Sequence, residues 1–224
     1  SSDVCSSDLT WYELNIFTKM RSFDDPHHII ADFLLQIKAV RLQPLNPFTW
    51  ASGLKSPIYC DNRKTLSYPK IRNYIRQQFV HEIESRYAKP DVIAGIATGG
   101  IPMGVLVAQD LGLPFVYVRA QAKQHGLSNM IEGDLKEQQQ VLVIEDLVST
   151  GKSSLQAVAE LRKAKARVDH MLSIFTYGFD SAAKSFLEAQ CSLVSLTNYH
   201  HLIEVAVQNQ YIQPKDFASL RSEE

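Results

Sequence analysis

Two adjacent carboxylates, Glu145 and Asp146, follow four β-favouring apolar residues and precede a turn rich in hydroxyl groups. The pattern over residues 141–154 predicts a strand that ends at Ile144, a loop, and a helix that begins at about Ser153. In a parallel sheet, such a loop lies beside the positive N-terminus of the next helix, where backbone N–H groups bind anions. The loop therefore predicts a phosphate site.

The carboxylates need a partner other than the phosphate, because they would repel it. Sugar hydroxyls and a hydrated Mg²⁺ ion are the simplest partners for such oxygens. The stretch therefore indicates a sugar phosphate rather than a bare phosphate. The alternative is an ordinary strand-to-helix turn with solvated acidic side chains, which would explain an acidic pair alone better than it explains the whole pattern.

Gly151-Lys152-Ser153 matches the last three positions of a nucleotide-binding Walker loop. That motif also requires a glycine five residues before the Gly-Lys pair, where this chain has Asp146. The sequence therefore excludes a Walker-type nucleotide triphosphatase.

The remaining pattern alternates strands with helices, which predicts an α/β fold with a parallel sheet and helices on both faces. We expect strands at 91–97, 115–118, 141–144, 168–178 and 193–196, and helices at 26–37, 69–87, 103–111, 153–164, 182–189 and 199–208. Ligands bind at the carboxyl ends of the strands in such a sheet. The loops 98–102, 119–133 and 145–153 each leave such an end, so we expect them to meet in one crevice.

Three cations, Arg119, Lys123 and His125, lie in the second of these loops, with glycines at 126 and 133 as hinges. This composition predicts a mobile flap that brings positive charge to an anion. A solvated basic loop is the alternative reading of this segment on its own.

The chain has 224 residues, 45% of them hydrophobic, and a net charge of −1. This size fits one globular domain, and the charge gives no general attraction to nucleic acid or anionic membranes.

Three scattered cysteines indicate a reducing cytoplasm rather than disulfides or a zinc site. No apolar run approaches the ~20 residues of a membrane span. We expect His200 and His201 on a helix surface or its edge rather than as metal ligands.

The amino-terminal residues repeat Ser-Ser-Asp and do not read as part of a domain. We predict that residues 1–19 are a non-native leader, that Met20 is the native start, and that residues 20–224 form a single domain.

Three segments together resemble a known family. Residues 141–153 resemble the phosphoribosyl-pyrophosphate (PRPP) signature of the type I phosphoribosyltransferases. Ser52-Gly53 with Lys55-Ser56-Pro57 resembles the hood segment of orotate phosphoribosyltransferases, and Arg119 with Ala122-Lys123-Gln124-His125-Gly126 resembles their catalytic loop. The resemblance implies the type I phosphoribosyltransferase fold, with a central parallel sheet flanked by helices, a small hood mainly from residues 20–65, and a flexible catalytic loop.

The resemblance also implies a reaction. Orotate would take ribose 5-phosphate from PRPP, giving orotidine 5′-phosphate and pyrophosphate in de novo pyrimidine (UMP) biosynthesis. Mg²⁺ would be bound through PRPP and water rather than directly by the protein. The enzyme would be a homodimer whose catalytic loop reaches the partner's site, without nucleic-acid or membrane partners.

The same resemblance assigns roles to individual residues. Lys123, His125, Glu145 and Asp146 would be catalytic, and Ser149 would also lie near the orotate. The residues implied in PRPP binding are Arg119, Lys123, His125, Glu145, Asp146, Leu147, Val148, Ser149, Thr150, Gly151, Lys152 and Ser153.

One expected contact is missing. Some relatives have an arginine for the orotate carboxylate just after the strand that ends here in Tyr177-Gly178, and this chain has none nearby. Which residue holds the orotate carboxylate is therefore open.

Two alternative functions remain. One is a phosphoribosyltransferase for another nucleobase. The other is a non-catalytic PRPP-binding regulator, which the flap cations argue against.

Overall fold

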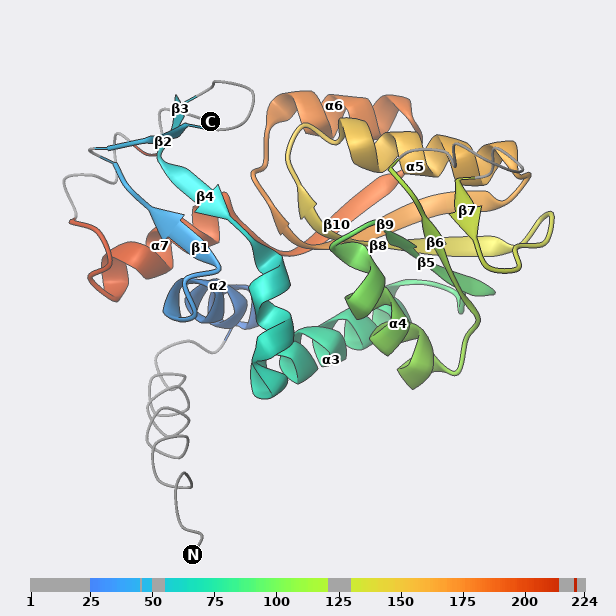
Figure 1. Ribbon diagram of the computed structural model, residues 1–224, viewed down its shortest axis with the longest axis horizontal. Helices are drawn as coiled ribbons and strands as arrows, with labels where there is room; N and C mark the ends of the chain where they lie inside the picture. Colours follow the sequence, from blue (N-terminus) through green and yellow to red (C-terminus); the bar gives the residue numbers. More distant parts are fainter. Residues whose placement is uncertain (1–24, 45, 50–54, 121–129, 214–219, 221–224) are drawn as a thin grey trace, which may run out of the picture.

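A six-stranded sheet forms the centre of the protein, in the order β10-β9-β8-β5-β6-β7 (Figure 1). The computed structural model describes residues 25–44, 46–49, 55–120, 130–213 and 220. The strands are β5 (Val92–Ile96), β6 (Phe115–Val118), β7 (Ile131–Glu132), β8 (Gln140–Val148), β9 (Arg167–Thr176) and β10 (Ser192–Asn198). Neighbouring strands are parallel except β7, which pairs antiparallel with β6. The predicted α/β architecture is confirmed.

Helices cover both faces of this sheet (Figure 1). They are α3 (Pro69–Arg86) and α4 (Gly100–Leu111) on one face, and α5 (Lys152–Lys163) and α6 (Asp180–Glu188) on the other. Alternation along β8 explains the two cores. Leu142 and Ile144 join the cluster on the α3 and α4 side, whereas Val141 and Val143 join the cluster on the α5 side. Successive side chains of a strand point to opposite faces, so each face receives its own apolar row.

A smaller unit lies beside the β10 end of the sheet (Figure 1). Its elements are α2 (Pro26–Gln36), β1 (Val40–Leu42), β2 (Phe48–Thr49), β3 (Lys55–Ser56), β4 (Ile58–Cys60), the 3₁₀ helix η2 (Asn62–Ser67) and α7 (Tyr199–Gln208). β1 pairs antiparallel with β4, and β2 with β3. These short hairpins occupy the segment predicted as the hood. Residues 1–19, the predicted leader, lie outside the described residues, so that prediction stands untested.

Most predicted bounds agree with the structure to within three residues, but the prediction that the central strand ends at Ile144 is wrong. β8 continues to Val148 because it pairs with β9 over this stretch, with Glu145 opposite Ser173 and Val148 opposite Thr176. The two carboxylates therefore belong to the strand itself. Pairing with a distant strand overrides the local change to polar residues.

Two smaller differences concern β7, which was not predicted, and α4, which begins at Gly100 rather than Met103. The earlier start of α4 places Pro102 in the first turn of the helix, where a missing N–H costs no intrahelical hydrogen bond.

Among the described helices, none is both long and apolar enough to cross a bilayer.

Candidate active site

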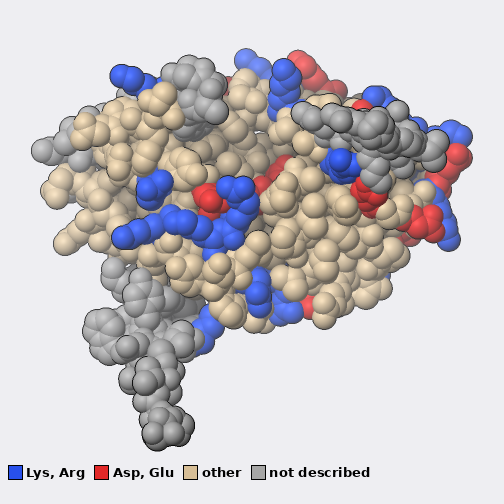
Figure 2. Space-filling model, in the orientation of Figure 1, with Lys and Arg blue, Asp and Glu red and all other residues tan. Residues whose placement is uncertain are grey.

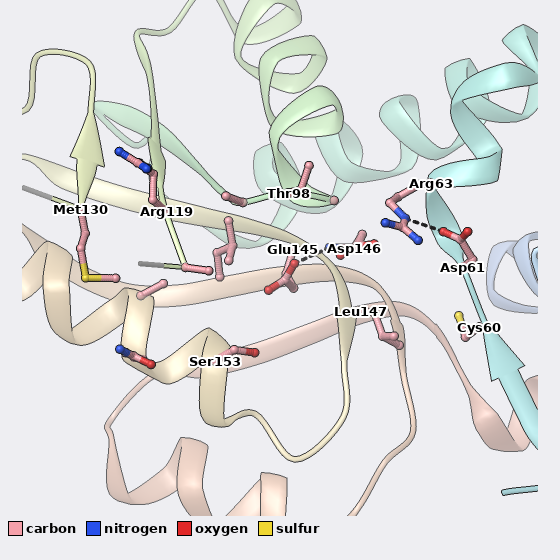
Figure 3. A pocket seen from close by; sticks show the side chains of 16 residues that line it. Cys60, Asp61, Arg63, Thr98, Arg119, Met130, Glu145, Asp146, Leu147 and Ser153 are labelled. Carbon is pink, nitrogen blue, oxygen red and sulfur yellow. Dashed lines mark hydrogen bonds and ion pairs between the residues drawn. The ribbon is translucent and has the colours of Figure 1, made fainter. Parts of the chain in front are cut away.

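A cavity of about 400 Å³ opens at the carboxyl ends of β5, β6 and β8. Its lining comes from the loop between β5 and α4, the end of β6, the end of β8, the first turns of α5, and the turn after β4 (Figure 3). Acidic and basic side chains lie side by side near the middle of the same face of the molecule (Figure 2). The described parts of the three predicted loops thus meet in one crevice.

Glu145 points toward α5 and is almost entirely buried, with 5% of its surface exposed. One carboxylate oxygen accepts a hydrogen bond from the Ser154 hydroxyl at 3.2 Å. The other accepts one from the backbone N–H of Asp146 at 3.0 Å. Ser154 is itself buried in α5. The side chain is therefore held in place before any ligand arrives.

Burial raises the pKa of Glu145 well above its usual range, and the neighbouring charge of Asp146 raises it further. Both causes disfavour the ionised form in the free protein. A ligand that donates hydrogen bonds or carries positive charge would reverse that preference. The pair is thus suited to hydroxyl groups and to a developing cation.

Asp146 points to the other face of the strand, toward the N-terminus of α4. A Cβ atom added to Gly99 would lie 2.2 Å from the Asp146 carboxyl carbon, and one added to Gly100 would lie 2.4 Å from the carbonyl oxygen of Ile144. Position 100 therefore requires glycine, and a side chain at Gly99 would displace the Asp146 carboxylate. This close approach brings the positive end of α4 to the cavity edge, where its N–H groups favour an anion.

A buried asparagine, Asn62, ties the hood to the catalytic strand. Its side-chain amide donates to the Asp146 backbone carbonyl at 2.7 Å, and its amide oxygen accepts from the Cys60 thiol at 3.2 Å. The Thr65 hydroxyl donates to the Asn62 carbonyl at 2.7 Å. Burial raises the pKa of the Cys60 thiol, so it stays protonated at neutral pH. Sequence reasoning missed this residue because its partner lies far along the chain.

Two arginines lie at opposite ends of the cavity, with the carboxylate pair between them (Figure 3). Arg63 donates from Nε to an Asp61 oxygen at 2.6 Å, and its side chain is 60% exposed. Arg119 faces Glu132 at 3.5 Å. Sequence reasoning predicted Arg119 but missed Arg63. The available signal was the charged turn Asp61-Asn62-Arg63, which directly follows a strand.

The structure gathers part of the predicted set. The predicted residues that line the cavity are Arg119, Glu145, Asp146, Leu147 and Ser153. Val148 is buried beneath them. Ser149, Thr150 and Gly151 form the connection from β8 to α5, and Lys152 is the first residue of α5; all four lie outside the cavity lining. Lys123 and His125 lie outside the described residues.

Gly151 fixes the shape of this connection. Its φ angle is +77°, and an added Cβ would lie 2.7 Å from the Phe186 ring. A larger residue would be strained by the backbone conformation and would also displace the ring. The predicted phosphate loop is therefore a tight turn at the N-terminus of α5.

Comparison with known proteins agrees with this site. A family model for the phosphoribosyl transferase domain matches residues 67–206, which include the cavity strands. An orotate phosphoribosyltransferase of Bacteroides thetaiotaomicron is 53% identical over 192 residues, which cover 86% of this chain and 91% of that protein.

Two solved structures are similar in fold. UMP synthase of Leishmania donovani has a TM-score of 0.72 and 26% identity, and the match covers 87% of this chain and 41% of that longer one. Orotate phosphoribosyltransferase of Aeropyrum pernix has a TM-score of 0.68 and 26% identity, over 82% of this chain and 99% of that one. On the family match and the identity, this chain belongs to the orotate phosphoribosyltransferases of the phosphoribosyl transferase domain family.

Proposed function

We propose that the chain transfers ribose 5-phosphate from PRPP to orotate, giving orotidine 5′-phosphate and pyrophosphate in de novo pyrimidine biosynthesis. The observation that carries this proposal is the carboxylate pair, buried Glu145 and half-buried Asp146, set between a helix start that favours an anion and arginines at both ends of one cavity. A sugar flanked by two anionic groups matches that distribution of charge.

The carboxylates act on the ribose. Glu145 and Asp146 accept hydrogen bonds from the ribose hydroxyls, and their charge favours the positive charge that develops on the sugar as the diphosphate leaves. The backbone from Val148 to Ser153 holds the 5′-phosphate at the N-terminus of α5. Ser149 lies next to the base.

The donor atoms of the cavity suit Mg²⁺. The side chains of its described lining residues offer carboxylate and hydroxyl oxygens and a protonated thiol, but no imidazole. Mg²⁺ prefers hard oxygen ligands and keeps several waters. When bound to PRPP, the ion would neutralise part of the negative charge of the diphosphate. Glu145 and Asp146 would hold the ion indirectly, through water, and PRPP would provide its direct ligands.

The flap acts on the diphosphate. Arg119, at the end of β6, together with Lys123 and His125 covers the leaving group with positive charge. Closure of the loop excludes water that would hydrolyse the activated sugar. In the homodimer that the family resemblance implies, Lys123 and His125 reach the site of the partner subunit.

Arg63 is our candidate for the orotate carboxylate. Asp61 and Asp146 are acidic neighbours that raise its pKa and keep it fully charged. It lies at the hood end of the cavity, opposite Arg119 (Figure 3). The guanidinium uses Nε for Asp61, which leaves its terminal nitrogens able to bind a carboxylate.

Removal of the flap lysine tests the reaction. We expect Lys123→Ala to lower turnover of orotate at least ~100-fold, the scale of one lost transition-state contact. Orotate consumption is followed by ultraviolet absorbance with PRPP and Mg²⁺. Lys163→Ala, on the exposed face of α5, is the control and should retain full turnover. Turnover with another base but not orotate would reject the proposed substrate, and no turnover with any base would favour a PRPP-binding regulator.

A mixing experiment tests the shared loop. Lys123→Ala and Asp146→Asn should each be nearly inactive as pure dimers. Subunit exchange should restore about a quarter of wild-type activity, because half of the dimers are hybrids and each hybrid has one intact site. If Lys123 served its own subunit instead, every site would carry a defect and mixing would restore nothing.

Arg63→Ala should raise the KM for orotate and leave the KM for PRPP nearly unchanged. A charge-assisted hydrogen bond contributes about 1.5–3 kcal/mol, so we expect kcat/KM for orotate to fall roughly 10- to 100-fold. Lys64→Ala is the matched control, because Lys64 is also exposed but donates to the Lys38 carbonyl at 3.1 Å and lies outside the cavity lining. Equal losses for both substrates would assign Arg63 a different role.

Glu145→Gln should separate stability from activity. The folded state raises the pKa of Glu145 above its ordinary value of 4.5, so it binds the proton more tightly than the unfolded chain does. Stability of the wild type therefore falls as pH rises from that value through the folded pKa. Denaturant unfolding should show that the glutamine variant gains stability over the wild type as pH rises. Its kcat/KM should fall roughly 10- to 100-fold through weaker bonds to the ribose. A pH-independent difference in stability would contradict this prediction.

A further inference from the structure

A cluster of histidines and carboxylates lies where the start of α2 meets the start of α7, away from the cavity. Asp25, His28 and His201 each offer one ligand atom, and these atoms lie within 4.8 Å of one another. Within the described part of the chain, these three residues form the group of His, Cys, Asp and Glu side chains whose potential ligand atoms lie close enough together to hold a metal ion. None of the three lines the cavity described above.

His28 is held by carboxylates on both sides of its ring. Nδ1 lies 2.7 Å from an Asp25 oxygen, and Nε2 lies 2.9 Å from a Glu204 oxygen. Burial lowers the pKa of His28, but its bonds to Glu204 and Asp25 raise it overall, so in the free protein both nitrogens can donate. A metal ion would replace the proton on Nδ1, while Nε2 would still donate to Glu204. A histidine that binds a metal through one nitrogen usually donates from the other to a carboxylate. Glu204 occupies that supporting position.

His201 completes the group from α7. Its Nδ1 is buried and has no hydrogen-bond partner among the described residues. Its ring centroid lies 4.8 Å from that of His28 and 5.2 Å from that of His27, on which it stacks. Burial lowers the pKa of His201, which favours the neutral ring. His200 and His201 are both partly exposed, which agrees with the predicted helix surface or its edge, and His201 also packs against α2.

Asp25 has the freedom that a ligand needs at this site. It is the residue before the first turn of α2 and makes no side-chain capping bond. Its side chain is 44% exposed. In the present geometry it faces His28 at hydrogen-bond distance, and a small rotation of an exposed carboxylate widens that gap enough to admit an ion in place of the proton.

The neighbouring histidines are already engaged elsewhere. His27 Nδ1 lies 2.7 Å from the Leu196 carbonyl, and His200 Nε2 lies 3.1 Å from the second Glu204 oxygen. These contacts position the rings around the cluster without filling its centre. The centre is thus left to two imidazoles and one carboxylate.

We propose that Asp25, His28 and His201 form a binding site for a first-row transition-metal ion such as Zn²⁺, with Glu204 as the partner that orients His28. Two imidazoles and a carboxylate suit zinc, with water in the remaining position, and disfavour Mg²⁺. The ion would join the start of α2 to α7, so that it stabilises the packing of the hood unit without entering the transferase reaction.

Calorimetric titration of the tag-free, chelator-treated full chain with Zn²⁺ tests this site. We expect one Zn²⁺ per chain, a Tm that rises with Zn²⁺, and no competition from Mg²⁺. His28→Gln and His201→Gln should each remove the stoichiometric site and the rise in Tm. Glu204→Gln should weaken binding roughly 10- to 100-fold, the usual effect of losing a supporting partner.

His81→Gln is the matched control, because His81 is an exposed histidine on α3 and should leave Zn²⁺ binding unchanged. Orotate turnover should be unaffected in all of these variants. Asp25→Asn, at a half-exposed side chain, gives the same test if a histidine variant folds poorly by circular dichroism. The proposal is overturned if the wild type binds no Zn²⁺ stoichiometrically, or if binding persists unchanged in folded Asp25→Asn and His28→Gln.

Discussion

The structure of the site depends on keeping two adjacent carboxylates, one buried and one half-buried, near the end of one strand. Burying a charge is costly unless hydrogen bonds or counter-charges compensate for the lost water. Here Glu145 receives the Ser154 hydroxyl and the Asp146 N–H, while Asp146 lies against a backbone that two glycines bring close. The raised pKa of Glu145 shows that compensation in the free protein is incomplete. The site is therefore preorganised for a ligand that supplies the missing positive charge.

This constraint explains features that are far apart in the sequence. The extension of β8 to Val148 holds the carboxylates on a rigid element, so their positions are better defined than they would be on a loop. Alternation along the strand sends Glu145 toward α5 and Asp146 toward α4, so that each carboxylate meets a different helix. The sugar can then be held between the two helix starts, each of which favours an anion.

Local sequence patterns were sufficient for the architecture. Apolar periodicity located α7 and β6 at their observed bounds, and the alternation of strands and helices predicted where the ligand loops meet. The end of β8 was misjudged because Glu145 and Asp146 read as the start of a loop, while pairing with β9 keeps them in the sheet. Asn62 and Arg63 were missed for a related reason. The Asn62 side chain donates to the Asp146 carbonyl, and Arg63 lines a cavity built mostly by distant segments, so neither feature depends on sequence neighbours.

The division between sheet and hood bears on how base specificity arises in this fold. In the proposed reaction, the sheet and the helix starts beside it supply the carboxylates, backbone N–H groups and Arg119 that bind the sugar and its anionic groups. The hood supplies Asp61 and Arg63 at the other end of the same cavity, where the base would lie. The Asn62 side chain joins the two parts by donating to the Asp146 carbonyl at 2.7 Å. Because that bond uses the backbone of Asp146 and not its carboxylate, side chains of the hood that would contact the base can change without disturbing the groups proposed to act on the ribose.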